Sequence, residues 1–158
     1  MDLFLAQNHA PMTHLPIAAS ILAALAAIAA IFIDKREIRW TWGMLTIIAF
    51  LTVIPTIATG IAAGIGRNYI EQGIMVADTP DNQTIRIHQM LGSAGALVAL
   101  VSAIAGVWYL RGKKVSRPLA AILALTVAIL WGIGGHLGGS ALWGPDTFPA
   151  YEQTEQPE

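Results

Sequence analysis

The stretch that decides the fold is PIAASILAALAAIAAIFI, residues 16–33, which is followed at once by Asp34, Lys35 and Arg36. It belongs to an interval, residues 3–33, in which no side chain is charged. A helix needs about 20 mostly apolar residues to cross a bilayer, so this run predicts a first membrane span. Because the run is long and no basic region precedes it, we expect a retained helix rather than a cleaved signal peptide.

Three more intervals, residues 40–66, 87–110 and 118–145, also lack charged residues. The chain has 158 residues, of which 55% are hydrophobic and 12% charged, a balance that is not typical of soluble domains. We expect four spans in contact with the lipid bilayer, at about 14–33, 40–65, 80–110 and 117–140. They form a single four-helix transmembrane domain over residues 1–145, followed by an acidic tail, 146–158.

Basic residues orient these spans. Seven of the nine lie in the short connections after the first and third spans: Lys35, Arg36, Arg39, Arg111, Lys113, Lys114 and Arg117. By the positive-inside rule both connections are cytoplasmic. The fold class is therefore predicted as an all-α membrane protein, an antiparallel up-down four-transmembrane-helix bundle with both termini outside. The acidic tail then lies on the outer side.

Proline and capping residues refine the helix ends. Thr13 and Pro16 predict that the first helix starts near His14, and Thr79 favours a start of the third near residue 80. Pro55 lies inside the second helix and is expected to kink it, because proline lacks the N–H that a helix requires.

Several classes of chemistry are excluded or disfavoured by residue content. The chain has no cysteine, which excludes disulfides, covalently attached c-type haem and cysteine-ligated iron–sulfur clusters. No acidic residue lies within the four charge-free intervals, so ion-coupled transport through buried carboxylates is disfavoured. We find no nucleophile elbow or phosphate-binding glycine loop, and no nucleic-acid partner is expected.

All four histidines fall at the outer side in this topology: His9, His14, His88 and His136. Some of them have ordinary structural explanations, since His9 could cap a helix or remain solvated, and His136 could bond a carbonyl. His88 lies within an apolar helix, where a polar side chain without a partner is costly. The histidines therefore form a candidate ligand layer.

Small residues accompany this layer. His88, Gly92 and Gly95 share one helical face, which leaves a smooth groove below an imidazole. Haem b needs two imidazoles from different helices together with space for its macrocycle. We predict His14 and His88 as the axial ligands of the haem iron, with His136 as a further residue of the cofactor site.

Arg67 and Arg86 are the two basic residues on the outer side. Their guanidinium groups suit the propionates of a haem, although contacts with lipid phosphate or with acidic loop residues would explain them equally well. A copper or zinc site facing the periplasm is a further alternative, since imidazole suits both metals. The histidine spacing does not select such a site.

Three short motifs resemble those of a known family. HAPMTHLPI, residues 9–17, resembles the H-P-x-x-V-H-F-P-I opening of the bacterial four-helix membrane family called domain of unknown function 2231. HQMLG at 88–92 resembles that family's H-x-x-x-G, and GGSALWG at 138–144 is similar to its closing G-G-x-L-V-x-x-G. This sequence departs from the pattern by an extra residue after His9 and by Leu15 in place of phenylalanine.

Members of that family resemble cytochrome b-like membrane anchors and occur fused to c-type cytochrome modules. The resemblance implies a location in the bacterial inner membrane with periplasmic termini, and it carries His14 and His88 over as the functional pair. Our hypothesis is a haem b-binding electron-transfer subunit that links the quinone pool to a periplasmic cytochrome or other redox subunit. It would act in a homo- or hetero-oligomer, as a subunit of a membrane oxidoreductase; whether the chain itself is an enzyme stays open.

The rival hypothesis is a cofactor-free membrane scaffold or interaction subunit. In that case the histidines and glycines serve helix packing, and the acidic outer tail contacts a partner. The copper or zinc site remains the third alternative.

Overall fold

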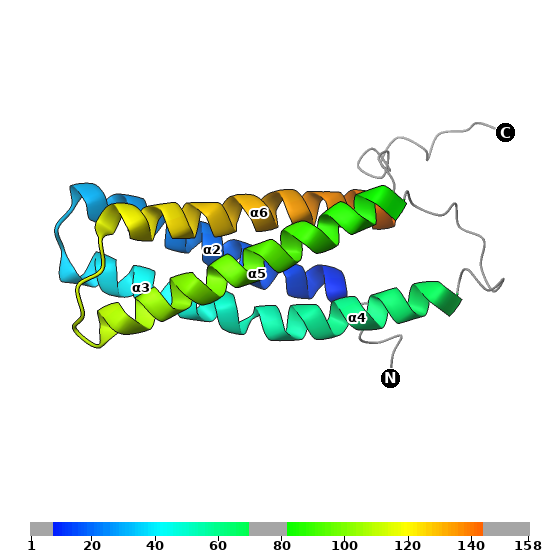
Figure 1. Cartoon of the computed structure of the whole chain (residues 1–158), viewed down its shortest axis with the longest axis horizontal. Helices are drawn as coiled ribbons and strands as arrows, with labels where there is room; N and C mark the ends of the chain where they lie inside the picture. The colour runs from blue at the N-terminus through cyan, green and yellow to red at the C-terminus, as the bar shows by residue number, and fades with distance from the viewer. Residues whose placement is uncertain (1–7, 70–81, 144–158) are drawn as a thin grey trace, which may run out of the picture.

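Long helices make up nearly all of the described chain, which in this computed structural model comprises residues 8–69 and 82–143. Five helical segments follow one another: α2 (His9–Phe32), α3 (Arg36–Leu51), α4 (Val53–Tyr69), α5 (Asn82–Leu110) and α6 (Arg117–Trp143) (Figure 1). They run back and forth along one axis, with α3 and α4 together forming the second crossing. No strand occurs among these residues.

Four helical stretches are long and apolar enough to cross a membrane: Met12–Phe32, Arg36–Ile61, Arg86–Leu110 and Arg117–Gly139. Large apolar side chains cover their outer surface, with exposed fractions of 80% at Phe32 and 60% at Ile122. Such a surface suits contact with lipid tails. The prediction of an all-α four-helix membrane bundle is confirmed, whereas the side on which the termini lie stays a prediction.

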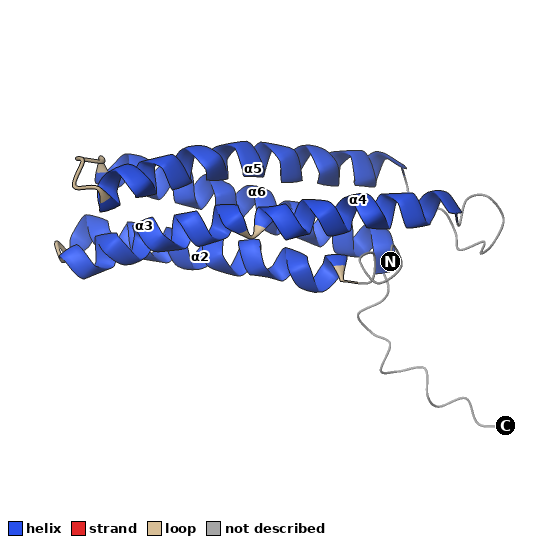
Figure 2. Cartoon of the chain, turned by 90° about the horizontal axis from the view of Figure 1, so that it is seen from below, coloured by secondary structure: helices blue, strands red, loops and turns tan. Residues whose placement is uncertain are grey.

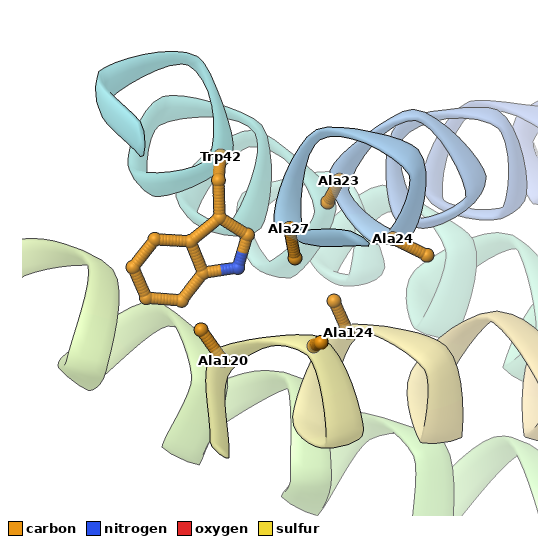
Figure 3. Packing of buried hydrophobic residues seen from close by; sticks show 7 residues of the cluster. Ala23, Ala24, Ala27, Trp42, Ala120 and Ala124 are labelled. Atoms are coloured by element: carbon orange, nitrogen blue, oxygen red, sulfur yellow. The ribbon is translucent and has the colours of Figure 1, made fainter. Parts of the chain in front are cut away.

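Small residues fill the interior of the bundle. Alanines of α2 and α6, with Trp42 of α3, form one buried cluster that includes Ala23, Ala27 and Ala124 (Figure 3). Apolar side chains gain little by leaving one hydrocarbon environment for another, so membrane helices associate by close packing, which small side chains allow. Most alanines of the first span thus lie on the inner face of α2.

A glycine pair fixes the closest approach of α3 and α5. A Cβ atom added at Gly106 would lie 2.8 Å from the carbonyl oxygen of Gly43 and 2.5 Å from Oγ1 of Thr46. Because a backbone atom is among these neighbours, the contact could not be relieved by a side-chain rotation alone. The crossing of these helices therefore depends on glycine at position 106.

Pro55 interrupts the second crossing. Helix α3 ends at Leu51 and α4 begins at Val53, so Pro55 lies in the first turn of α4, where its missing N–H breaks the bond to Leu51. Figure 2 shows a short loop between the two helices at this point. The kink predicted from Pro55 is thus a one-residue interruption at Thr52.

A second proline creates an interhelical hydrogen bond. Pro16 lies inside α2 and has no N–H to offer the carbonyl of Met12 four residues earlier. The hydroxyl of Thr56 in α4 lies 3.0 Å from that carbonyl and donates to it, sharing its proton with the carbonyl of Thr52. This contact ties the outer part of α2 to α4.

Several predicted boundaries differ from those observed. Helix α2 begins at His9 instead of near His14, and α6 extends to Trp143. The predicted start of the third helix at Thr79 and Pro80, like the acidic tail, lies outside the described residues. The earlier start of α2 matters most, because it includes His9 in the first turn.

A carboxylate joins the connections at one end of the bundle. Residues 33–39 and 111–117 form this end, called the basic end below, and Asp34 accepts bonds there from Arg39 at 2.6 Å and Arg117 at 2.5 Å. The hydrogen bond from Arg117 and the positive charges of both arginines hold the pKa of Asp34 below its ordinary value. Gly112 lies in the second connection, between Arg111 and Lys113. Its φ angle of 78° is in the left-handed region, which glycine adopts more readily than other residues.

Replacing Thr56 by valine should lower the free energy of unfolding by about 0.5–1.5 kcal/mol, because the Met12 carbonyl loses its donor. Thr52→Val is the matched control, since the Thr52 hydroxyl bonds to carbonyls of the preceding helix, α3, and to no carbonyl of α2. In a Pro16→Ala background, the restored N–H should reduce the effect of Thr56→Val. Unfolding in mixed micelles measures these changes; equal effects of both threonine substitutions would refute the assignment.

The Asp34 contacts should make stability depend on pH. A carboxyl with a lowered pKa contributes stability above its ordinary pKa, and this contribution is lost as pH falls through the lowered value. The melting temperature of the parent protein should therefore exceed that of Asp34→Asn at pH 7, and the difference should shrink toward about pH 3. A difference independent of pH would contradict this explanation. The exposed position of Asp34 implies a small effect.

Candidate functional site

Two histidines from different helices meet at the end opposite the basic end. The rings of His9 in α2 and His88 in α5 have centroids 6.3 Å apart, and their planes are nearly perpendicular at 88°. In Figure 1 the start of α2 lies at the same end of the bundle as the start of α5 and the end of α4. We call this region the histidine end.

A threonine orients His9. Nδ1 of His9 lies 3.2 Å from Oγ1 of Thr59, whose hydroxyl lies within 3.0 Å of two carbonyls of its own helix, those of Pro55 and Thr56. With two carbonyls of its own helix as acceptors for its single proton, the hydroxyl has a lone pair of Oγ1 with which to accept from Nδ1–H of His9, and we assign this tautomer. In the uncharged imidazole, Nε2 then carries the free lone pair.

His9 precedes the first apolar span, and its pKa is lowered by partial burial and, to a smaller extent, by the neighbouring His88. Both effects favour the uncharged ring, because burial and a nearby positive charge each penalise protonation. An uncharged imidazole is the form that binds metals. The environment of His9 therefore favours the form that binds metals.

A backbone carbonyl orients His88. Its Nδ1 lies 2.6 Å from the carbonyl oxygen of Gly134 in α6. A carbonyl can only accept, so Nδ1 of His88 bears the proton and donates it, which leaves Nε2 with the lone pair in the uncharged ring. Both histidines thus have the same nitrogen, Nε2, available as a ligand.

This arrangement resembles that of metal-binding histidines in proteins, which commonly donate one ring N–H to a carbonyl or other acceptor and bind the metal through the other nitrogen. Two imidazoles that bind one ion from opposite sides, with bonds of about 2 Å, have ring centres about 6 Å apart. The separation between the ring centroids of His9 and His88 matches this value. The spacing of the two rings therefore suits a pair of axial ligands.

Glycines make room for both rings. A Cβ at Gly138 in α6 would lie 2.6 Å from Cε1 of His88, and a Cβ at Gly60 in α4 would lie 3.0 Å from Cε1 of His9. The glycine-rich segment of α6 therefore has two roles at this site, since Gly134 provides a carbonyl and Gly138 provides space. The sequence indicated only close packing for this segment.

The groove predicted beside His88 is partly filled. A Cβ at Gly95 would meet the indole of Trp131, whose Nε1 donates a 3.3 Å hydrogen bond to the carbonyl of Gly92. Gly95 therefore packs against Trp131 and not against an open groove. A Cβ at Gly92 would meet nothing within 4 Å in the described part, so the groove is open at that position.

His14 occupies a different face of α2 from His9. Five residues along a helix correspond to a rotation of about 140°, so His14 points away when His9 faces α4 and α5, and its side chain is exposed. The structure thus brings His9, not His14, to His88. The prediction had discounted His9 because it started the helix near His14; Thr56, Thr59 and Gly60, which share a face of α4, were the signal for a partner at His9.

The remaining predicted site residues lie at the same end of the bundle. The side chains of His136 and Arg86 are exposed. Arg67 lies in α4, but its side chain belongs to the part of the chain that the structure does not describe. Their proposed roles around a cofactor stay predictions.

A copper or zinc site would need several ligand side chains close together. Among residues 8–69 and 82–143, no group of three or more histidine, aspartate or glutamate side chains is close enough to hold a metal ion. A protein-ligated zinc site takes three or four such ligands. The copper or zinc site that was the third alternative stays a prediction.

Comparison with known proteins gives no relative: no protein-family model, curated protein or solved structure matches this chain. The resemblance to the domain of unknown function 2231 family consequently stays a prediction. Any function must be argued from the geometry of the histidine end.

Gly138→Ala should displace the His88 ring and lower the free energy of unfolding by about 1–3 kcal/mol, as expected for overpacking. Gly139→Ala is the matched control, because a Cβ there meets nothing within 4 Å of the described residues and alanine favours the helix. Chemical denaturation in micelles measures both. A neutral Gly138→Ala with a destabilising Gly139→Ala would contradict the position of His88.

Proposed function

We propose that this chain is a membrane subunit that binds haem b at the histidine end, with His9 and His88 as axial ligands, and takes part in electron transfer. The observation that supports the proposal most directly is the pair of imidazoles from two helices, 6.3 Å apart, each with Nδ1 bonded to a protein acceptor. The proposal substitutes His9 for His14, the ligand that the sequence favoured.

Two protein ligands suit haem better than an isolated metal ion. The porphyrin supplies four nitrogens of its own, so two axial residues complete the coordination, as in bis-imidazole cytochromes of helical bundles. A zinc or copper ion held by protein alone needs more ligands than this pair provides. When bound, haem supplies one-electron redox chemistry.

The residues of the chain have separate tasks in this proposal. Thr59 and the Gly134 carbonyl hold the ligand rings in fixed orientations, which second-shell partners commonly do. A Cβ at Gly92 would meet nothing within 4 Å of the described residues, which supports space for a flat group beside His88. Arg86 is exposed at the same end and is available to a propionate.

The histidine end is opposite the basic end, which by the positive-inside rule supports a position on the periplasmic side of a bacterial inner membrane. We propose exchange of electrons between the quinone pool and a periplasmic cytochrome or redox subunit. This part of the proposal rests on the positive charge of the two connections and on the resemblance to the domain of unknown function 2231 family.

The competing function is a cofactor-free scaffold. It is favoured by the indole of Trp131, which fills the space at Gly95, and by the close fit of the two imidazoles against Gly60 and Gly138. In that function the perpendicular rings of His9 and His88 pack against each other and require no metal. The two functions differ in whether a haem binds.

A visible spectrum of the purified protein, oxidised and then reduced with dithionite, tests the proposal. The parent protein, expressed with haem supplementation, should show b-type Soret and α bands. His9→Gln and His88→Gln should each remove these bands by loss of an axial ligand, while His14→Gln and His136→Gln serve as matched controls and should retain them. Circular dichroism checks that every variant is folded.

Two outcomes would overturn parts of this proposal. If the folded parent protein shows no b-type bands after supplementation, haem binding fails and the scaffold is favoured. If the bands disappear in His14→Gln but persist in His9→Gln, the ligand pair is His14 and His88, and His9 is not an axial ligand.

A further inference from the structure

The basic end carries an excess of positive charge. Its two connections contain seven basic residues and two acidic ones, Asp34 and Glu37, for a net charge of +5. Exposed tryptophans lie at the same level, with 47% of Trp40 and 57% of Trp108 accessible. Amphipathic rings of this kind prefer the depth of lipid headgroups, so this end lies where phospholipid phosphates are.

A small cavity opens among the helices at this end. It has a volume of about 20 Å³, and its lining includes Arg39 and Trp42 of α3, Tyr109 of α5 and Arg117 of α6. A space of this size holds one water-sized group. It can therefore accommodate one oxygen atom of a ligand or a bridging water, while the rest of a larger ligand lies at its mouth.

Trp42 has an unsatisfied donor at this cavity. Its side chain is 3% exposed, and its indole Nε1 has no hydrogen-bond partner among the described residues. Figure 3 shows the nitrogen turned toward the gap between the alanines of α2 and α6. A buried donor without an acceptor is costly, and more so in an apolar environment, so an acceptor bound next to this N–H would stabilise the protein.

Two guanidinium groups converge at the mouth of the cavity. Arg39 donates to the hydroxyl of Tyr109 at 3.1 Å and to Asp34, and Arg117 donates to the same carboxylate oxygen. The carboxylate of Asp34, whose side chain is 65% exposed, thus marks a position where both arginines bind one anionic oxygen. A guanidinium has five N–H donors, so these contacts leave others for a second anion.

We infer that the cavity at Arg39, Trp42, Tyr109 and Arg117 is a binding site for the phosphate group of an anionic phospholipid. The phosphate lies at the mouth, where both guanidiniums bind it in competition with Asp34, and one oxygen or a bridging water reaches the Trp42 N–H. Charge complementarity and the interfacial depth select a lipid of the bilayer over a soluble phosphate. This site is independent of the proposed haem function.

Native mass spectrometry of the full-length protein in detergent, with added phosphatidylglycerol or phosphatidylcholine, tests this inference. The parent protein should retain phosphatidylglycerol about tenfold better than phosphatidylcholine. Trp42→Phe, which removes the N–H but keeps an aromatic ring, should reduce retention several-fold. Asp34→Asn, which removes the competing carboxylate, should increase it.

Charge-matched variants separate a built site from general attraction. Arg39→Gln with Arg117→Gln should abolish the preference, whereas Lys113→Gln with Lys114→Gln removes the same charge outside the cavity and should change retention less than about twofold. The conservative pair Arg39→Lys with Arg117→Lys keeps the charge but loses the forked geometry, so it should also bind weakly.

Three results would overturn the inference. Equal losses in the arginine and lysine double variants would show attraction by net charge alone. Unchanged retention in Trp42→Phe, or a decrease in Asp34→Asn, would show that the cavity is not involved. Thermal stabilisation by inorganic phosphate equal to that by phosphatidylglycerol would assign the site to a soluble anion.

Discussion

The fold depends on close approach of helix backbones through small side chains. In a membrane, helices do not gain by hiding apolar surface from lipid, so contact area and satisfied polar groups must hold them together. The alanine seam of α2 and α6 and the glycine contact between α3 and α5 provide this contact. Bulky residues are displaced to the lipid-facing surface, which explains why interior positions are so often alanine, glycine or serine.

The same constraint explains the interruptions of the helices. Prolines leave carbonyls without a helical partner, and in a membrane such carbonyls need another donor. The hydroxyl of Thr56 supplies one to Met12, freed by Pro16, and thereby joins α4 to the turn of α2 that precedes the first span. This contact holds His9 close to Thr59 and, on the other side, to His88. The position of the candidate site is thus a consequence of how the bundle satisfies its backbone.

Sequence patterns predicted the fold more completely than the site. Charge-free intervals are long enough to reveal each span, because crossing a bilayer requires length and apolarity and little else. The histidine pairing depends instead on helix rotation, and a start of α2 near His14 instead of at His9 left the contact between His9 and His88 unforeseen. The filling of the space at Gly95 could not be foreseen either, since Trp131 belongs to another helix whose rotation the sequence does not fix. For His88, by contrast, the expected need for a partner is met by the Gly134 carbonyl, because a histidine within an apolar helix needs one wherever the helices turn.

The two ends of the bundle differ in chemistry, with imidazoles at one end and paired guanidiniums at the other. The central claim is that His9 and His88 face each other with Nδ1 protonated and Nε2 available. Nitrogen-15 NMR of histidine-labelled protein in lipid nanodiscs, before and after addition of haem, tests it most directly. We predict Nδ1–H tautomers for both residues and changes at both Nε2 atoms on adding haem, with His14 and His136 unaffected. An Nε2–H tautomer at either residue, or a response confined to His14 and His136, would contradict the claim.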